Sequence, residues 1–458
     1  MPQYPDGTRI REAEWNRLLE SIPSSYTLWL DGTTYRAESN VSGGTDYSNA
    51  DFPTVFQQAV DALPTEGGTI HLKGNIFEGY VELDRDGIIL EGEGSWSDIP
   101  AGIPDNPPTV LHGSVIKVTT ADKDGIKIVG QRHGIQIRNL GIWFTQATTG
   151  HGITTDTTQT YTLTHFVIEN IKVLNCDKNH YALQLVNFLH GNVRAIMAWG
   201  GPLLNIYANK DNFNPGNTIF DNLYLYLKYD LTVDFVAGPY PIFIHKNDAL
   251  AALWPNLVSL RRIQVNHPIA QTDPQFYVMV CWDLRYSTIT ELDIEGVNEK
   301  VLLMGNCYHV KFDAPYLWTV APGTSYVSAD NTTHYVTFEN GYLEDIIDNG
   351  ATDAYANCEV AGTIDSTTVA KFDNLVGNSG VATILIGTPS ITPTARFIGP
   401  NDYVVLTIIN AGALATGEEL KVDTINRAPV NTFVVNCLDE GNASAAITFY
   451  WEIRHVPA

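Results

Sequence analysis

Residues 217–227, with the sequence NTIFDNLYLYL, decide the fold of this chain. Two apolar positions precede a polar pair, Asp221-Asn222, which predicts a turn, and after the turn leucine alternates with tyrosine. Because successive side chains of a strand point to opposite faces, the leucines share one face and the tyrosines share the other. A strand with one apolar face needs neighbours to cover that face. We therefore expect the pattern to recur along the chain.

The pattern of a turn followed by alternation returns at intervals of roughly 25 to 40 residues, and repeats of this length indicate a solenoid. The segments are IQIRNLGIWF, VIENIKVLN, VRAIMAW, IFDNLYLYL, LRRIQVN and ITELDIEG, with less regular copies in YHVKFDAPYLW and HYVTFENGYLEDI. The inward residues that follow the turns are Leu140, Ile171, Ile196, Leu223, Ile263 and Leu292. Asn139, Asn170 and Asn222 precede three of them, and asparagine tolerates left-handed backbone and can stack as a hydrogen-bonded ladder inside the coils. Because strands dominate, we predict a β-solenoid.

An amphipathic helix is predicted over residues 51–63. Asp51 is a suitable N-cap, Pro53 lies in the first turn, and apolar residues at helical spacing form one face. Before it, the sequence predicts a short helix over residues 5–22 and a hairpin in SYTLWLDGTTYRAES with Asp31-Gly32 at the turn.

Residues 51–94, which include VFQQAVDALPTEGGTIHLKG and GIILEGEG, resemble the entry segment of the pectate-lyase-like superfamily. In that superfamily an amphipathic helix plugs one end of a right-handed parallel β-helix, and the Gly-Gly-Thr strand begins the first coil. The resemblance implies a fold and leaves the reaction open, because one fold hosts many activities. The polygalacturonase-like pattern is missing, since Gly150-His151-Gly152 stands alone and is typical of a turn.

The last hundred residues follow a different pattern. Short strands broken by Gly, Pro and Asn, such as YVVLTIINAG and AITFYWEIRHV, predict a small β-sandwich. The predicted organisation is all-β, with a leader (1–50), a parallel β-helix with its capping helix (51–360) and the sandwich (361–458). This layout resembles that of trimeric phage tailspikes, which implies a homotrimer.

The charge of the chain bounds its partners. With 27 Lys and Arg against 51 Asp and Glu, the formal net charge is -24, which repels nucleic acid and anionic membranes. No apolar run is long enough to span a membrane, and MPQYPDGTRIREAEWNRLL has no apolar signal core. The five cysteines are scattered and predict small buried hydrophobic residues without metal-ligand spacing. We expect an extracellular or virion-associated protein.

Outward residues of the repeats form two columns on one face, with neighbouring coils about 4.8 Å apart. The first column is Gly141, Lys172, Met197, Tyr224, Gln264 and Asp293, and the second is Trp143, Leu174, Trp199, Tyr226, Asn266 and Glu295. Sugar rings stack on aromatic faces, so Trp143, Trp199, Tyr224 and Tyr226 predict a polysaccharide-binding strip, with Gln264 and Asn266 as further contacts. The alternative is that long loops or a neighbouring subunit cover these aromatic residues.

Asp293 and Glu295 lie two residues apart on one strand, hence on one face, with Cα atoms roughly 6.5–7 Å apart. Glycoside hydrolysis requires two carboxyl groups, and a separation of about 6.5–9.5 Å suits inversion. The pair therefore predicts a glycoside hydrolase. Asp283, in CWDLRY, is a third catalytic candidate, and Asp234 and Asp313 are further rivals.

A polysaccharide lyase is the alternative, because β-elimination on a uronic acid polymer needs a base and a cation or Ca²⁺ to neutralise the carboxylate. The candidates are Arg261, Arg262, His245, Lys246, Tyr240 and Arg285; strand alternation predicts opposite faces for Arg261 and Arg262. We include Arg262, His245 and Lys246 among the substrate-binding residues. His245 and Lys246 belong to the longest insertion, between residues 228 and 256, where solenoids often bind ligands. No metal site or cofactor is expected for a hydrolase, and Ca²⁺ only for a lyase. A non-catalytic glycan-binding spike is the third alternative.

Overall fold

The computed structural model describes residues 25–40, 46–97, 110–145, 150–156, 162–209, 215–234, 237–247, 254–296, 300–319 and 326–343, and beyond them the strands up to Arg454. The chain divides into two compact units: an N-terminal unit of residues 1–229 with 247–253, and a C-terminal unit of residues 230–246 with 254–458. The helix predicted over residues 5–22 lies outside the described residues.

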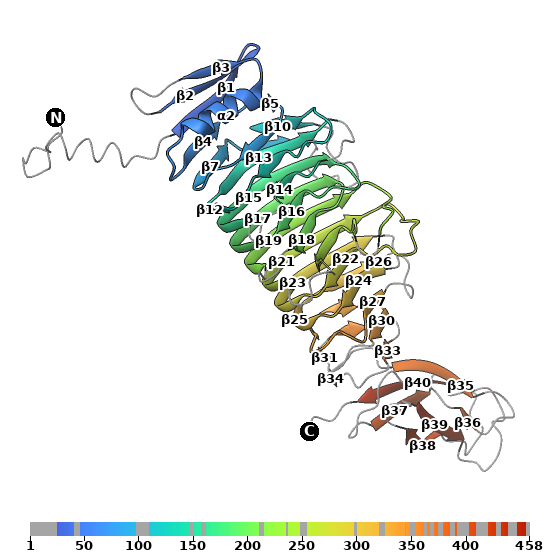
Figure 1. Cartoon of the computed structure of the whole chain (residues 1–458). Coiled ribbons are helices and arrows are strands. Elements are labelled where there is room, and N and C mark those ends of the chain that lie inside the picture. Colours follow the sequence, from blue (N-terminus) through green and yellow to red (C-terminus); the bar gives the residue numbers. More distant parts are fainter. Residues whose placement is uncertain are drawn as a thin grey trace, which may run out of the picture. The chain divides into compact units, whose positions relative to one another are not determined.

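The N-terminal unit begins with the predicted hairpin and helix. Strands β1 (Ser25–Asp31), β2 (Thr34–Ser39) and β3 (Tyr47–Asn49) pair antiparallel, and β1 also pairs parallel with β4 (Gly68–Leu72). Helix α2 (Phe52–Ala62) begins after Asp51, whose side chain accepts a hydrogen bond from the Thr54 amide. Its apolar face is buried, and Figure 1 shows the helix at the N-terminal end of the stacked strands. The predicted capping helix is therefore confirmed.

Successive coils of this unit stack in parallel (Figure 1). The first-sheet strands are β4, β5 (Ile76–Glu78), β7 (Ile88–Gly92), β10 (Val115–Val118), β12 (Arg132–His133), β13 (Gln136–Phe144), β15 (Leu163–Cys176), β17 (Phe188–Gly200) and β19 (Gly216–Leu227). The second-sheet strands are β6 (Val81–Leu83), β11 (Ile126–Ile128), β14 (Ile153–Thr155), β16 (Leu183–Val186) and β18 (Leu204–Ala208). Strands β8 (Ser95–Ser97) and β9 (Leu111–Gly113) pair as an antiparallel hairpin.

The C-terminal unit repeats this parallel pairing. Its first-sheet strands are β21 (Asn256–His267), β23 (Arg285–Gly296), β25 (Tyr308–Asp313), β26 (Tyr316–Thr319), β28 (Thr337–Glu339), β29 (Tyr342–Leu343), β31 (Ala354–Ala356), β32 (Glu359–Val360) and β34 (Lys371–Asp373). Its second-sheet strands are β20 (Ile242–Lys246), β22 (Met279–Trp282), β24 (Lys300–Gly305), β27 (Tyr326–Ala329), β30 (Asp345–Asp348) and β33 (Ile364–Ser366). The predicted right-handed parallel β-helix is confirmed, and parallel pairing continues past the boundary expected at residue 360.

Two three-stranded antiparallel sheets follow the coils. One contains β35 (Ser379–Ile384), β40 (Ile447–Arg454) and β37 (Tyr403–Ile408), and the other contains β36 (Ser390–Ile391), β39 (Thr432–Cys437) and β38 (Leu420–Asn426). Paired antiparallel sheets of short strands are the arrangement expected for the predicted C-terminal β-sandwich.

A left-handed residue bends each long first-sheet strand at the position that the sequence predicts to be a turn, and at Ala314 and Asn340 the same corner separates two short strands. The φ angles lie between 51° and 57° at Asn139, Asn170, Ala195, Asn222, Arg262, Glu291, Ala314 and Asn340. The amide of Asn170 donates to Oδ1 of Asn139 at 2.9 Å, as expected of an asparagine ladder. The ladder lies at an exposed corner, however, and not inside the coils as predicted, because the left-handed residue itself directs its side chain outward.

The residues that follow these corners form the core. Leu140, Ile171, Ile196, Leu223, Ile263 and Leu292 are all buried, as predicted. Burying one such side chain stabilises the fold by about 1.5–3 kcal/mol. Phe166, Phe188 and Phe220 stack edge to face in the N-terminal unit, with ring centroids 5.9 and 6.0 Å apart. Cys176, Cys281, Cys307 and Cys358 are buried free thiols, as expected, and the side chain of Cys437 lies outside the described residues.

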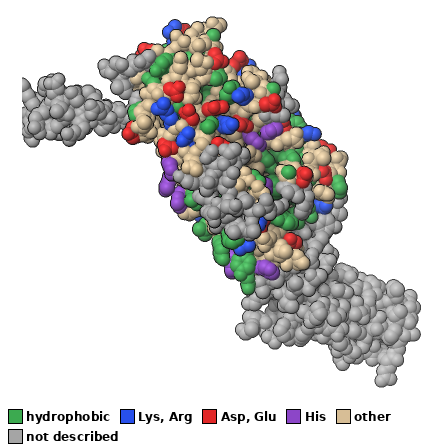
Figure 2. Space-filling view, in the orientation of Figure 1, with side chains coloured by type: hydrophobic (Ala, Val, Ile, Leu, Met, Phe, Trp, Pro, Cys, Tyr) green, Lys and Arg blue, Asp and Glu red, His purple; other side chains and the backbone are tan. Residues whose placement is uncertain are grey.

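Charged side chains of both signs are interspersed over the N-terminal coils on the face shown in Figure 2. Glu169 forms ion pairs with arginines on both neighbouring coils. Nε of Arg138 lies 3.4 Å from Oε1, and Nε of Arg194 donates a hydrogen bond to Oε2 at 2.5 Å. Within the described ranges, no helix has the length and apolar character needed to cross a bilayer.

Candidate functional site

The two predicted outward columns exist within each unit. In the N-terminal unit, strand register aligns Gly141, Lys172, Met197 and Tyr224 in one column and Trp143, Leu174, Trp199 and Tyr226 in the other. In the C-terminal unit, Gln264 aligns with Asp293, and Asn266 aligns with Glu295. The alternation of the sequence thus places these side chains in the predicted columns, because the residues after each left-handed corner pair in register with those of the neighbouring coils.

Part of the N-terminal column is covered. Trp199 and Tyr226 are only 8% and 6% exposed, and they pack in a cluster with Leu111 of the β8–β9 hairpin. That hairpin lies against the coils, since a Cβ added to Gly141 would be 3.1 Å from Cδ1 of Leu111. For Trp199 and Tyr226 this low exposure agrees with the alternative prediction, in which other segments cover the outward aromatic residues. Trp143 and Tyr224 are partly buried beside the cluster.

In the C-terminal unit the strip contains amides, carboxylates and aromatic rings in succession. Register places Asp293 between Gln264 on β21 and Tyr316 on β26. Glu295 likewise lies between Asn266 and the backbone of Trp318. Neighbouring coils are about 4.8 Å apart, so groups in adjacent positions can contact one sugar unit together.

Asp293 has the properties of a proton donor. Its Oδ1 atom is buried and has no hydrogen-bond partner among the described residues. Burial, followed by the negative charge of Glu295, raises the pKa of Asp293 to about 6. A carboxyl group with a raised pKa is suited to donate a proton, and Asp293 shares this face of β23 with a second carboxyl group, Glu295.

Sequence reasoning missed the aromatic side of this site. Tyr316 is 44% exposed, and its ring centroid lies 5.3 Å from that of Tyr342 on the next coil. The signal was present in YHVKFDAPYLW, where alternation resumes after Ala314-Pro315. The corner there is left-handed at Ala314, and alanine is not a residue type that predicts a left-handed turn.

The third carboxylate candidate, Asp283, belongs to a different corner, directly after β22. Its side chain is 1% exposed, accepts a hydrogen bond from the Asn306 amide and lies 3.6 Å from Nζ of Lys246. Burial raises its pKa, while the Lys246 charge acts in the opposite direction. His245 is 8% exposed, stacks on Phe243 and has its pKa lowered to about 3 by burial. These residues form a buried cluster at the end of the second sheet.

The prediction that Arg261 and Arg262 face opposite sides is wrong. Both are exposed, because the left-handed φ of 52° at Arg262 interrupts the strand alternation. The other rival residues have structural contacts: Asp313 accepts a hydrogen bond from the Asn340 amide at 3.0 Å, and the Arg285 guanidinium lies 3.7 Å from the centroid of the Trp254 ring. Tyr240 is fully buried.

The Gly-His-Gly segment forms a coil corner, as predicted. Nδ1 of His151 accepts a hydrogen bond from the Tyr181 amide at 2.9 Å, and burial lowers the pKa of His151 to about 3. A Cβ added to Gly150 would lie 2.0 Å from the carbonyl oxygen of Lys123, so only glycine allows the coils to approach this closely. Across the described ranges, no group of three or more His, Cys, Asp or Glu side chains is arranged to hold a metal ion.

No protein-family model matches the chain. No curated protein matches it either. Among solved structures it is similar to the A-module of the Azotobacter vinelandii mannuronan C-5 epimerase AlgE6, with 14% identity and a TM-score of 0.35 over 71% of this chain and 95% of that one. It is also similar to the tailspike protein gp49 of Pseudomonas phage LKA1, with 11% identity and a TM-score of 0.34 over 84% of this chain and 87% of that one. These likenesses are too distant to transfer an activity or a residue role.

Proposed function

We propose that this protein binds a polysaccharide and hydrolyses its glycosidic bonds at the strip of β21, β23 and β26. The observation that supports this most strongly is the pair Asp293 and Glu295 on one outward face, where Asp293 has a buried oxygen and a pKa raised to about 6. A general acid works best with a pKa near the working pH, and glycosidases raise the pKa of one carboxyl for this purpose.

In this mechanism Asp293 protonates the departing glycosidic oxygen. Glu295, two residues further along β23, acts as the general base that activates a water molecule. Strand geometry sets the two Cα atoms roughly 6.5–7 Å apart. We propose inversion of the anomeric centre, which requires the carboxyl groups themselves to lie about 6.5–9.5 Å apart with room for a water molecule. A retaining enzyme would need carboxyl groups only about 5–5.5 Å apart.

The neighbouring side chains suit a sugar chain that crosses the coils. The exposed ring of Tyr316, with Tyr342 beside it, offers an aromatic surface for a sugar ring. Gln264 and Asn266 offer amide donors and acceptors for sugar hydroxyls on the other side of the carboxylates. Arg262 is an exposed corner residue of β21 that can extend this surface. Trp143 and Tyr224 are candidate sugar contacts of the N-terminal unit.

The contacts of the candidate basic residues favour a lyase less than a hydrolase. It requires an accessible base and a cation, whereas Tyr240 and His245 are buried and Lys246 lies against Asp283. If the protein is a lyase, bound Ca²⁺ would neutralise the uronate, and if it is neither enzyme, the strip serves a glycan-binding spike.

We also propose that the protein is a homotrimer and is extracellular or virion-associated. The C-terminal unit presents an exposed column at the start of its coils, composed of Leu257, Tyr286, His309 and Tyr335. The rings of Tyr286 and His309 are 5.3 Å apart and those of His309 and Tyr335 4.8 Å apart. Because the rings stack on each other, they present their edges outward, which suits contact with protein more than with a sugar face. Sedimentation equilibrium tests this, and a monomer would refute it.

A polysaccharide assay tests the reaction. The protein is incubated with neutral and uronic polysaccharides, and both reducing ends and absorbance near 235 nm are followed. Hydrolysis yields reducing ends alone, and elimination yields both signals. We expect Asp293→Asn and Glu295→Gln to abolish release, while Glu66→Gln, which changes an exposed carboxylate elsewhere, leaves it unchanged. Asp283→Asn should lower stability more than turnover. Full activity in the first two variants would refute the proposed site.

A further inference from the structure

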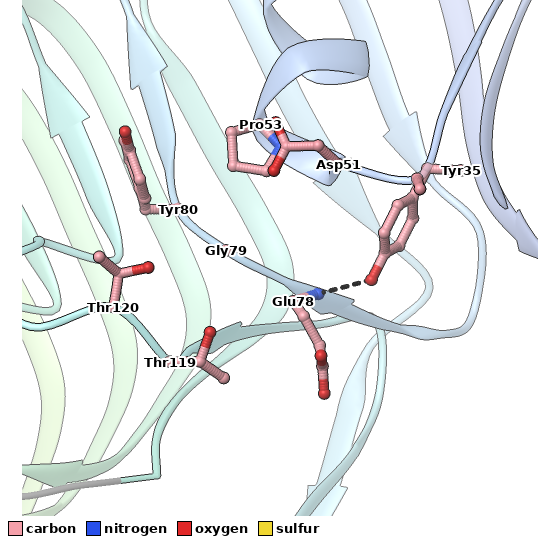
Figure 3. Close-up of a pocket in the computed structure, with 9 residues that line it drawn as sticks. Tyr35, Asp51, Pro53, Glu78, Gly79, Tyr80, Thr119 and Thr120 are labelled. Carbon is pink, nitrogen blue, oxygen red and sulfur yellow. Dashed lines mark hydrogen bonds between the residues drawn. The ribbon is translucent and has the colours of Figure 1, made fainter. Parts of the chain in front are cut away.

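The N-terminal unit contains a polar cavity between the capping helix and the first two coils. It has a volume of about 320 Å³ and is lined by Tyr35, Ala50, Asp51, Pro53, Glu78, Gly79, Tyr80, Thr119 and Thr120. Small-molecule sites range from roughly 300 to 1,000 Å³, so this cavity has room for a small ligand. Figure 3 shows Asp51 and Pro53 at the start of α2, with Thr119 and Thr120 across the cavity and residues 78–80 between them.

The walls of the cavity are fixed by contacts among its lining residues and with one residue outside it. The Tyr35 hydroxyl accepts a hydrogen bond from the Glu78 amide at 3.0 Å, which fixes the strand at one wall (Figure 3). Gly79 has a φ of 145°, and a Cβ there would lie 2.7 Å from the ring of Pro53. Lys123, which does not line the cavity, places Nζ 4.4 Å from the centroid of the Tyr80 ring and holds that ring by a cation–π contact.

The lining groups offer unused hydrogen-bonding capacity. Oδ2 of Asp51 caps α2, and Oε1 of Glu78 pairs with Lys117 at 2.7 Å, which leaves the second oxygen of each carboxylate unpaired in the described part of the chain. The hydroxyl groups of Thr119 and Thr120 have no hydrogen-bond partner among the described residues. The Tyr35 hydroxyl accepts a bond but donates none there.

This chemistry selects one ligand class. Acceptors, hydroxyl groups and an aromatic ring in one cavity suit a polyhydroxylated molecule, whereas the lining contains two carboxylates and no cationic side chain to bind a phosphate or a uronate. We infer that this cavity is a second saccharide site, distinct from the carboxylate pair of β23, and that it takes one or two neutral or amino-sugar units. The choice of a saccharide rests on the proposed function, but occupancy of the cavity does not require the chain to cleave anything.

Calorimetric titration of the full chain tests this inference. The probes are cellotriose, maltotriose and the glucosamine trimer, with trigalacturonate as the anionic probe and Ca²⁺ alone as a competing occupant. Asp293→Asn is used as the background, so that cleavage cannot obscure binding. We expect at least one neutral or amino trisaccharide to bind, and Tyr80→Ala and Thr120→Val each to weaken it by roughly tenfold, which is about 1.4 kcal/mol.

The control is Glu66→Gln, which changes an exposed carboxylate outside both sites and should leave this affinity unchanged. Binding that is unaffected by both cavity variants would overturn the inference, as would binding of only trigalacturonate or Ca²⁺, or of no probe. A protein that cleaves no polysaccharide but loses trisaccharide binding in the cavity variants would refute the hydrolase and uphold this site.

Discussion

Replacement of Asp293 by asparagine should stabilise the protein at neutral pH while abolishing its activity. The pKa of Asp293 is raised to about 6 from a usual value of 3.8, mainly by burial. The native state therefore binds more protons than the unfolded state between about pH 4 and 6, and stability falls as the pH rises through that window. Stability linked to this group is complete below about pH 4 and lost above about pH 6.

The magnitude follows from the size of the shift. About two pKa units correspond to about 3 kcal/mol at 1.36 kcal/mol per unit. Because Asp293 is partly exposed, solvent screening reduces this to about 1.5 kcal/mol. Asparagine carries no charge, so Asp293→Asn should be more stable than the unmodified chain by this amount at pH 7.5 and equally stable at pH 4.

Equilibrium urea unfolding at both pH values measures this difference. Glu66→Gln serves as the control, since it removes an exposed carboxylate and should show the same stability as the unmodified chain at both pH values. Glu295→Gln should recover part of the gain at pH 7.5, because the Glu295 charge contributes to the raised pKa. An Asp293→Asn variant that is no more stable at pH 7.5 than at pH 4, relative to the unmodified chain, would refute the argument.

Two further predictions concern the coils. Ala195→Asn should raise the free energy of unfolding by about 0.5–1 kcal/mol, because asparagine tolerates the left-handed φ of 54° at this corner. Asn170→Ala should lower the free energy of unfolding for the same reason. Urea midpoints equal to that of the unmodified chain would contradict the corner assignment. Gly296→Ala should destabilise the protein by about 1–3 kcal/mol, because the added Cβ would lie 2.3 Å from the buried His267 ring, and an unchanged urea midpoint would show that the ring can move.

The periodic part of the fold could be predicted from the sequence. Alternation after Asn139, Asn170 and Asn222 marks both the inward residues and the outward columns, since asparagine announces the left-handed corner. The same corner at Ala195 or Arg262 carries no such signal. There the neighbouring coils impose the conformation on a residue that does not prefer it, so the outward direction of Arg262 could not be predicted.

The candidate site also has residues that the sequence pattern predicts and residues that it does not. Asp293 and Glu295 are found by their spacing alone, because two residues on one strand share a face. The burial of Trp199 could not be predicted, since Leu111, which packs in its cluster, comes from a hairpin far earlier in the sequence. Tyr316 could not be assigned to the site from the sequence, because its register with Asp293 depends on a left-handed corner at Ala314. The local sequence pattern predicts which way a side chain points, whereas its burial depends on contacts between segments far apart in the sequence.

The crystal structure of the Asp293→Asn variant with an oligosaccharide that the unmodified chain cleaves tests the central claim most directly. We expect a glycosidic oxygen within hydrogen-bonding distance of residue 293, a water molecule beside Glu295 and a sugar ring against Tyr316. An oligosaccharide bound with its glycosidic bonds out of reach of both residues 293 and 295 would contradict the proposed active site.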